Sequence, residues 1–474
     1  MSIPVPTVHS LGDVYSSDAL SAQKGRYDQI RTAFASAFDG AVPDFYARAP
    51  GRVNLIGEHV DYSGYGVLPM AIAQDIVVAV AIAKTPGTQC TIANTNPKHA
   101  KFSFDGANIV IDTKKHHWGN YAMAGYKGIT EALGLTSPRS LYLMVDGVIP
   151  AGAGLSSSSA LVCCIALAVA RGHDKVLTKL EFAEICTKCE RYIGTEGGGM
   201  DQSISFMANQ GAAMNIEFGP LRAFPVKLPD GAAFVVADSS VVSEKQVTAA
   251  TNFNLRVVEC RLSALLLAKL GGVQNWQEAR TILRAQNALN ASFDAMLALV
   301  SKHFHPHDYS LTELSGLFGL PESEIVSSFM SASTVEARSF RLFQRVSHVL
   351  QEASRTAQFK TVCDTAPDAT TALAKLGQLM NDSHTSCRDL YECSCEELDD
   401  LTSICRQQGA LGSRLTGAGW GGCCVSLVPS DKVDAFVANV KRLYFERKGI
   451  ANGLIFASPP GCGAAIVASD AVSK

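Results

Sequence analysis

The sequence lacks the features that would point to a membrane, to nucleic acid or to export. No window of about 18 uncharged apolar residues appears, and the closest stretch, Leu155 to Ala170, contains a run of four serines. The net charge of −3 provides no excess of basic surface, which nucleic acid or an anionic membrane requires. The N-terminus, MSIPVPTVHSLGDVYSSDAL, has no basic start followed by an apolar core, so it is not a secretory signal. We therefore expect a cytoplasmic protein with no nucleic-acid partner and no membrane association.

A complete zinc-binding pattern is also missing. Cys186-x-x-Cys189 could form half of a zinc site, but no second pair and no His-x-x-x-His lies at a suitable spacing. Most of the 14 cysteines lie in apolar runs, as Cys163 and Cys424 do, where cysteine acts as a small hydrophobic residue. We interpret them as reduced thiols in the cytosol.

The composition and the hydrophobic pattern predict a folded α+β protein. Its 474 residues are 47% hydrophobic and 18% charged, which suits two or three globular domains. Between residues 45 and 112, short β-rich runs alternate with Gly, Pro and Asn, which predicts an antiparallel or mixed sheet; the runs are FYARA, DIVVAVAIA, CTIAN and NIVIDT. Helical periodicity marks 120–135, 157–172, 255–270, 275–301, 338–357 and 368–382. We predict two lobes that divide near 225–235, and a polar, irregular surface insertion over about 300–335.

Two capping boxes predict helix starts. Thr178-x-x-Glu181 opens a helix that should end near Gly194, with Glu190 close to that end. Ser394-x-x-Glu397 should open another helix that stops at Gly409.

Glycines and serines lead into an apolar helix in PAGAGLSSSSALVCCIALAVA, which runs from Pro150 to Ala170. The backbone N–H groups and the dipole at a helix N-terminus form an anion site, and Gly152 and Gly154 would let a phosphate approach the backbone. A Gly/Ser turn that only caps a core helix explains this stretch equally well. No Gly-Lys-Ser/Thr follows, so the stretch is not a Walker A loop.

Two other glycine-rich stretches are ambiguous by themselves. GAGWGG at 417–422 matches the dinucleotide fingerprint, but CCVSLV after it is β-like, so it is better interpreted as a loop that could pack beside another phosphate loop. EGGGMDQ at 196–202 predicts a sharp chain reversal that presents Asp201. An Asp in this position is usually a turn residue or a cap, and a functional role requires a cationic or phosphate-binding partner nearby.

Four polar side chains lie within APGRVNLIGEHVDYSGYGVLPMAI, at 49–72: Arg52, Glu58, His59 and Asp61. Their neighbours are apolar, and a buried polar cluster costs free energy unless each member has a partner. Mixed donors and acceptors suit the hydroxyls of a sugar. An internal salt-bridge network between Arg52 and the two acids is the alternative.

Together these stretches resemble the GHMP kinases and, within them, the galactokinase branch. GRVNLIGEHVDY is similar to the galactokinase signature, PAGAGLSSSSA to the ATP loop and LTGAGWGGC to the third motif, and the similarity covers nearly the whole chain from about Phe45. VDYSGYGVLPMAI and RYIGTEGGGMDQSISF depart from the usual TDYNGG and GIMDQ, and they are similar to the N-acetylgalactosamine kinase subgroup. The resemblance implies an N-terminal lobe (1–228) related to the second domain of ribosomal protein S5 and a ferredoxin-like C-terminal lobe (229–474), with the active site between them.

The resemblance also implies roles for individual residues. Asp201 would be the catalytic base, ionised beside the catalytic Arg52. The sugar would be held by Arg52, Glu58, His59, Asp61, Gly198, Asp201 and Phe253. ATP would contact Trp118, Gly152, Gly154, Leu155, Ser156, Ser157, Ser158 and Ser159, and Mg²⁺ would contact Ser158 and Glu190.

Three functions follow as hypotheses, each for a monomer that binds ATP, Mg²⁺ and a small sugar. The first is a kinase that makes N-acetyl-α-D-galactosamine 1-phosphate and has weaker activity on galactose. The second is a galactokinase with galactose as its main substrate. The third is a sugar and ATP sensor without catalysis, for which we would expect a damaged phosphate loop, whereas PAGAGLSSSSA, Arg52 and Asp201 are all present.

Overall fold

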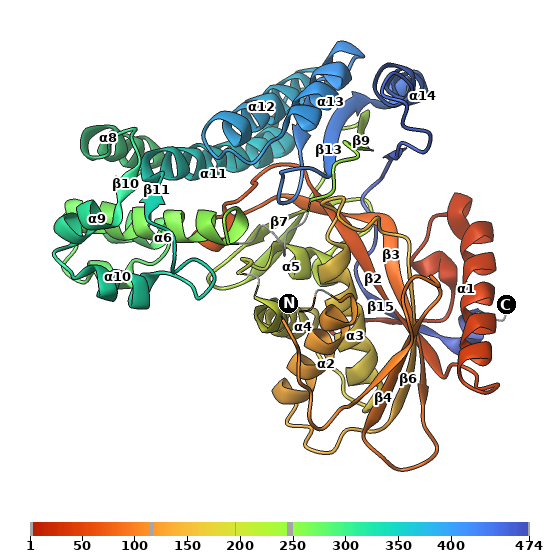
Figure 1. The fold of residues 1–474 in the computed structure, drawn as a ribbon. Coiled ribbons are helices and arrows are strands. Elements are labelled where there is room, and N and C mark those ends of the chain that lie inside the picture. The colour runs from red at the N-terminus through yellow and green to blue at the C-terminus, as the bar shows by residue number, and fades with distance from the viewer. Residues whose placement is uncertain (1–2, 114, 116, 195, 244–249, 473–474) are drawn as a thin grey trace.

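A computed structural model describes residues 3–113, 115, 117–194, 196–243 and 250–472, which form two lobes and a group of helices that projects from the second lobe (Figure 1). The first lobe is built on a seven-stranded mixed sheet in the order β1-β15-β2-β3-β6-β4-β5. Its strands are β1 (Thr7–Val8), β2 (Phe45–Asn54), β3 (Pro69–Ile82), β4 (Gln89–Asn94), β5 (Phe102–Asp105), β6 (Leu141–Gly147) and β15 (Ala465–Ala468). Three of the four predicted β-rich runs are strands, but NIVIDT is not, because residues 108–113 form irregular chain and a turn.

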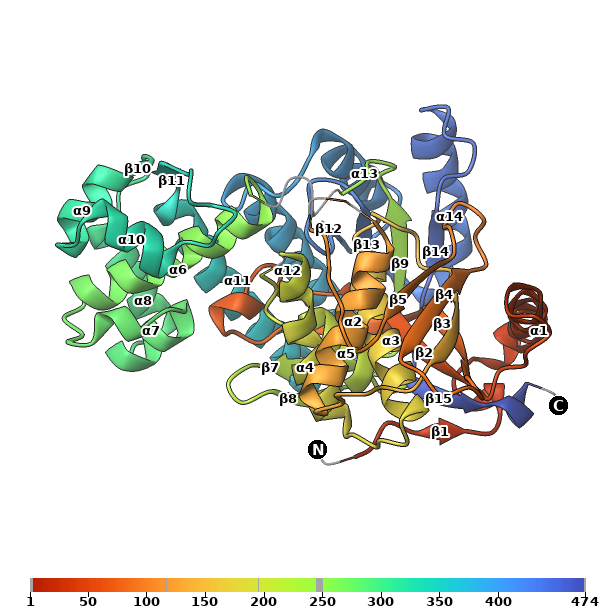
Figure 2. The ribbon, with the colours of Figure 1, turned by 60° about the horizontal axis from the view of Figure 1, so that its bottom comes forward.

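Helices cover both faces of this sheet (Figures 1 and 2). One face packs against α1 (Leu20–Ala37), and the other carries α2 (Gly119–Ala132), α3 (Ser157–Gly172), α4 (Lys179–Cys189) and α5 (Met200–Met207). Helix α3 is buried along nearly its whole length, as its uncharged sequence predicts. The capping box of α4 is formed as predicted, and a 3₁₀ turn continues α4 to Gly194, whose left-handed backbone ends it.

The second lobe has a four-stranded sheet in the order β12-β13-β9-β14. Its elements are β9 (Ala232–Asp238), β12 (Gly412–Leu415), β13 (Cys423–Pro429), β14 (Ile455–Ala457), α11 (Leu342–Thr365), α12 (Ala369–Asp389), α13 (Glu396–Gln407) and α14 (Val433–Val440). A hairpin of β7 (Ala213–Glu217) and β8 (Arg222–Val226) precedes β9. The division at 228/229 stays a prediction, and β15, near the end of the chain, pairs with β2 in the sheet of the first lobe.

The projecting helices correct two predictions about the second half of the chain. They are α6 (Phe253–Leu270), α7 (Ile282–Leu289), α8 (Phe293–His303), α9 (Leu311–Phe318) and α10 (Glu322–Phe329), with a short hairpin of β10 (Tyr309–Ser310) and β11 (Ser339–Phe340). The segment 300–335 is therefore not irregular, because Leu314, Phe318, Ile325 and Phe329 give it a buried apolar core. The single helix predicted over 275–301 is also wrong.

Local capping explains the break in that predicted helix. Thr281 caps α7, Asn290 ends α7 in the left-handed conformation, and the Ser292 side chain caps α8.

The second predicted capping box, Ser394-x-x-Glu397, is wrong as well. Helix α13 begins after Cys395, and the Ser394 hydroxyl donates to Asp399 at 2.6 Å.

No helix within the described residues is both long enough and apolar enough to cross a membrane.

Candidate active site

A cleft of about 400 Å³ lies beside residues 150–160, the predicted phosphate loop (hereafter the phosphate loop). On the loop side it is lined by Gly152, Gly154, Ser156, Ser157 and Ser158, and on the other side by Asn94, Asn96, His99, Trp118 and Tyr121. Leu155 and Ser159 are part of the loop but do not line the cleft. Trp118 lines the cleft, and its indole Nε1 has no hydrogen-bond partner among the described residues. Its role toward adenine stays a prediction.

The phosphate loop owes its shape to three residues with positive φ. These are Gly152 (+71°), Gly154 (+73°) and Ser156 (+59°), and α3 begins directly after them. The Ser156 side chain makes no capping hydrogen bond, so the first N–H groups of α3 are not satisfied by that side chain. Ser157 and Ser158 at the start of this 16-residue helix line the cleft, which favours the phosphate interpretation over the simple cap.

The glycine-rich loop at 417–422 packs against the phosphate loop, as predicted. A Cβ on Gly417 would lie 2.3 Å from the Gly154 carbonyl, and a Cβ on Gly422 would lie 2.8 Å from Ala153. The Cys423 N–H donates to the Ala153 carbonyl at 2.9 Å, and β13 follows. The backbones of the two loops therefore touch directly, which only residues without a side chain permit.

A second cavity adjoins the cleft and collects the residues that the sequence predicts for the sugar. Its lining includes Arg52, Glu58, His59, Asp61, Glu190, Gly198, Asp201 and Phe253. Four segments thus meet at this cavity: β2, the glycine-rich stretch 196–202, α6 and the glycine-rich loop 417–422. A Cβ on Gly198 would lie 2.4 Å from the Tyr62 backbone nitrogen, so this glycine is required for the loop to approach the 61–62 turn.

Arg52 and Asp201 form an ion pair where the two cavities meet. Arg52 Nε donates to Asp201 Oδ1 at 2.8 Å, and Arg52 Nη1 donates to the Gly154 carbonyl of the phosphate loop at 2.6 Å. Asp201 lies in the first turn of α5, and Arg52 lines both cavities. The cationic partner that a functional Asp201 requires is therefore Arg52.

Glu58 has a different partner from the one considered in the sequence. Its carboxylate accepts hydrogen bonds from Arg414 Nη1 at 2.9 Å, Asn54 Nδ2 at 2.7 Å and the Gly417 N–H at 2.6 Å. Burial raises the pKa of Glu58, and the charge of Arg414 opposes that effect. The salt-bridge network thus joins Glu58 to Arg414 in β12, and its role toward the sugar stays a prediction.

Of the two residues predicted for the metal, Ser158 lines the cleft and Glu190 lines the second cavity. Ser159 Oγ donates to Glu190 Oε1 and lies 3.3 Å from Asp201 Oδ2. No cluster of three His, Cys, Asp or Glu side chains in the described part of the chain could hold a metal by itself. A cation here would therefore take further ligands from phosphate oxygens, as Mg²⁺ commonly does.

Comparisons with known proteins identify the family of the chain. Three family models match: the galactokinase galactose-binding signature over 32–82, the GHMP kinases N-terminal domain over 109–209 and the GHMP kinases C-terminal domain over 369–446. The galactokinase of Dictyostelium discoideum is 44% identical over 461 residues, which cover 93% of this chain and 91% of that protein. The galactokinase of Saccharomyces cerevisiae is 35% identical over 86% of this chain and 87% of its own. The chain belongs to the galactokinase family.

Solved structures show the same fold. The Lactococcus lactis galactokinase complexed with galactose has a TM-score of 0.73 at 24% identity, with 93% of this chain and 99% of that chain covered. The Methanococcus jannaschii mevalonate kinase has a TM-score of 0.51 at 16% identity, with 88% and 98% covered. As a member of the galactokinase family, the chain is a sugar kinase of the GHMP group, and this group uses ATP with Mg²⁺.

Several residues of the site were not predicted from the sequence. Asn94, Asn96, His99 and Tyr121 line the cleft, and Tyr62, Gln202 and Ala418 line the second cavity. Tyr62, Gln202 and Ala418 lie inside stretches that the sequence already singles out, so these three could have been found. Asn94 ends the ordinary strand β4 and Asn96 follows it, and neither carries a signal of its own.

Proposed function

We propose that the chain transfers the γ-phosphoryl group of ATP to the anomeric hydroxyl of galactose, giving galactose 1-phosphate and ADP. The relatives that match along most of their length are named galactokinases, and the galactose-binding signature covers the segment that contains Arg52, Glu58, His59 and Asp61. The single observation that carries the proposal is the Arg52–Asp201 pair at the junction of the two cavities. This junction is where a phosphoryl donor and a hydroxyl acceptor would meet.

Asp201 is the base in this proposal. Its carboxylate accepts the proton of the anomeric hydroxyl while that oxygen attacks the γ-phosphorus and ADP leaves. Arg52, which is 3% exposed, places a fixed positive charge beside the transferring group, where charge develops. Its bond to the Gly154 carbonyl links this charge to the phosphate loop.

Ser158 and Glu190 are the residues that we propose for Mg²⁺. Hydroxyl and carboxylate oxygens suit this cation, and the two residues line the two adjoining cavities, Ser158 the cleft and Glu190 the second cavity. When bound, Mg²⁺ would neutralise charge on the phosphate oxygens. Gly152, Gly154 and the start of α3 would hold the phosphates themselves.

N-acetylgalactosamine is the second candidate substrate. One observation favours it: Phe253 packs with Val257 and Ala418 in an apolar cluster at the cavity, with Tyr62 and Trp420 against it. Such a cluster could accommodate the methyl group of an acetamido substituent. The names of the relatives favour galactose, so galactose is the main proposal.

The test is ADP release with Mg·ATP and, in parallel, galactose, N-acetylgalactosamine and N-acetylglucosamine. We expect the highest kcat/KM with galactose. A higher value with N-acetylgalactosamine would overturn the main proposal and support the second candidate. Tight binding of sugar and ATP without any turnover would favour a sensor. Asp201→Asn under the same conditions shows whether the measured turnover comes from this site.

A further inference from the structure

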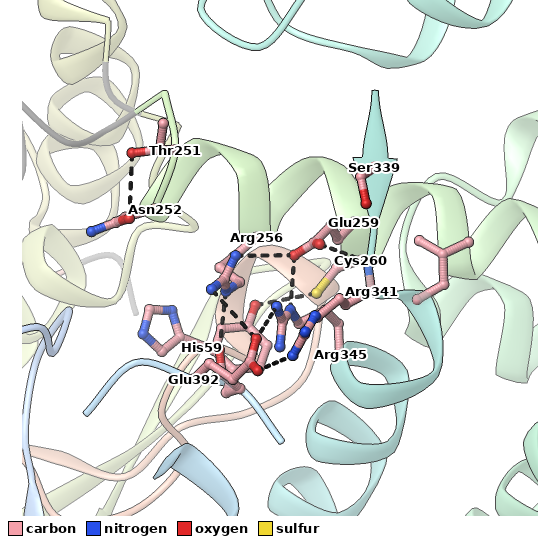
Figure 3. Close-up of polar contacts among 12 residues, drawn as sticks. His59, Thr251, Asn252, Arg256, Glu259, Cys260, Ser339, Arg341, Arg345 and Glu392 are labelled. Atoms are coloured by element: carbon pink, nitrogen blue, oxygen red, sulfur yellow. Dashed lines mark hydrogen bonds and ion pairs between the residues drawn. The ribbon is translucent and has the colours of Figure 1, made fainter. Parts of the chain in front are cut away.

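A chain of hydrogen bonds runs from the projecting helices to the junction of the two cavities. It starts at Cys260 in α6, whose Sγ lies 3.2 Å from the Tyr391 hydroxyl. The Tyr391 hydroxyl lies 2.5 Å from the Tyr62 hydroxyl, which lies 2.9 Å from His59 Nδ1. His59 Nε2 lies 3.0 Å from the Ala418 carbonyl oxygen. Figure 3 shows His59, Cys260 and the charged residues that surround the middle of this chain.

For a neutral His59 ring, the last acceptor determines the direction of every hydrogen bond. A carbonyl oxygen can only accept, so His59 Nε2 carries a hydrogen and donates it to Ala418. In the neutral ring Nδ1 is then an acceptor, and the Tyr62 hydroxyl donates to it. Because Tyr62 has one proton, Tyr391 must donate to Tyr62, and the Cys260 thiol must donate to Tyr391.

The protonation states agree with this direction. Burial raises the pKa of Tyr62 and of Tyr391 well above the ordinary value, so both keep their protons. Burial also raises the pKa of the Cys260 thiol to about 11, so it too remains a donor at neutral pH. Each hydroxyl that accepts a hydrogen bond becomes a stronger donor in turn, so the chain strengthens the bond to His59.

Tyr391 is held by its backbone and its ring. Arg345 Nη1 donates to the Leu390 carbonyl at 2.6 Å, and Arg256 Nε donates to the Tyr391 carbonyl at 3.0 Å. Glu259 bridges the two arginines, as Figure 3 shows, at 2.8 Å from Arg345 and 3.3 Å from Arg256. The Tyr391 ring stacks on His59 with the ring centres 4.6 Å apart, yet Tyr391 does not line the sugar cavity.

The other end of the chain lies at the junction of the two cavities, because Ala418 lines both of them. We propose that Tyr391 is a positioning residue for phosphoryl transfer, which acts through Tyr62 to hold His59 as its Nε2–H tautomer and so fixes the Ala418 loop between nucleotide and sugar. The proposal deepens the proposed function and rests on it for the kinetic test alone.

The first test is independent of activity. The ¹⁵N spectrum of selectively histidine-labelled protein reports which ring nitrogen carries hydrogen, and His59→Gln identifies the His59 signals. We expect the Nε2–H tautomer in the wild type. The Nδ1 signal should shift in Tyr391→Phe, which keeps the stacked ring and loses only the hydroxyl, and it should shift further in Tyr62→Phe. An Nδ1–H tautomer in the wild type would overturn the proposal.

The second test is a double-mutant cycle. We expect Tyr391→Phe to lower kcat/KM for the sugar about fivefold, the effect of one neutral hydrogen bond. The same substitution should have almost no effect in a Tyr62→Phe background, because its influence passes through Tyr62. Equal losses in both backgrounds would assign Tyr391 a merely structural role. Cys260→Ser, which keeps a donor, should retain more activity than Cys260→Ala.

Tyr444→Phe is the matched control, since the Tyr444 hydroxyl is also buried and donates to the Ser239 carbonyl at 2.9 Å. It should lower Tm as Tyr391→Phe does but leave kcat/KM unchanged. If Tyr391→Phe likewise lowers Tm and leaves kcat/KM unchanged, the proposal fails. The kinetic measurements use whichever sugar the wild type phosphorylates. If the wild type phosphorylates none, the proposed function fails. The ¹⁵N spectra still decide whether the hydrogen-bond chain orders His59.

Discussion

Arg52 contacts both the proposed catalytic base and the phosphate loop. Its Nε faces the Asp201 carboxylate and its Nη1 faces the Gly154 carbonyl of the phosphate loop. A single guanidinium can do this because its donors point in fixed, divergent directions. The position of one side chain therefore sets the distance between the proposed base and the phosphates.

Replacing Asp201 by Asn tests the base at this scale. We expect kcat to fall by about 10²- to 10⁴-fold, the usual contribution of a general base, while the affinities for sugar and ATP change little. Calorimetry measures the affinities, and ADP release measures kcat. Asp294→Asn, at an exposed position, should behave as the wild type. Turnover of Asp201→Asn within a few fold of the wild type would refute the base assignment.

His348 gives a prediction about pH. It is fully buried, its Nε2 donates to the Glu58 carbonyl at 3.1 Å, and burial lowers its pKa from 6.5 to about 4. Between these values the unfolded chain binds a proton that the folded protein does not, so stability falls as the pH falls from 6.5 to 4. The loss reaches about 3 kcal/mol at the lower end.

Denaturant unfolding between pH 7 and pH 4.5 measures this effect. His348→Gln should remove part of the wild-type loss in the free energy of unfolding, and the difference between the two proteins should grow as the pH falls. The exposed His303→Gln should follow the wild-type curve. Parallel curves for wild type and His348→Gln would contradict the prediction.

At the scale of elements, the loop before α5 depends on a glycine that lets it approach residues 61–62 closely. Gly198 lies against the 61–62 turn, where an added Cβ would lie 2.4 Å from the Tyr62 nitrogen. We expect Gly198→Ala to push the loop away from this turn and to lower kcat/KM for the sugar at least tenfold, because a shift of the loop displaces Asp201. Steady-state kinetics with varied sugar measures the loss.

Gly197→Ala provides the comparison within the same loop, because a Cβ there meets nothing within 4 Å. It should keep most of the activity, which separates the steric clash from a general loss of loop flexibility. Similar activities for the two variants would show that the close approach at Gly198 is not needed.

Elements with strong local signals could be predicted, and those that depend on distant contacts could not. Helix α3 begins and ends as its apolar run indicates, and the Thr178 capping box is formed. The short helices α9 and α10 were missed because Phe318 and Phe329 gain their stability from packing with Trp276, far away in sequence. Glu58 shows the same limit in the site, since its partner Arg414 lies 356 residues away.

At the scale of the whole molecule, the Glu58–Arg414 pair joins the two lobes. Arg414 is fully buried, and it also donates to the Asn54 carbonyl at 2.9 Å and to Ser383 Oγ at 3.0 Å. Removing one member of a buried ion pair leaves an uncompensated charge, which costs about 3–5 kcal/mol. We expect Arg414→Met to lower the free energy of unfolding by this amount, as measured in denaturant.

The double variant Glu58→Gln/Arg414→Met should recover part of that loss, because it also removes the Glu58 charge, while the buried Glu352, 3.8 Å from Arg414, keeps Arg355 as its partner. Arg222→Met, at an exposed ion pair with Glu217, should change stability by less than about 1 kcal/mol. If Arg414→Met were as mild as Arg222→Met, the pair would contribute little to the contact between the lobes.

The position of β15 has a consequence for synthesis. Residues 465–468 fill the place between β1 and β2, so a nascent chain cannot complete its first sheet until this segment has left the ribosome. Throughout translation, the edge of β2 is an unpaired strand that other chains can join. We therefore expect a chain that stops before residue 465 to leave this edge of β2 unpaired and to aggregate more readily than the full chain, even though its motifs are all present.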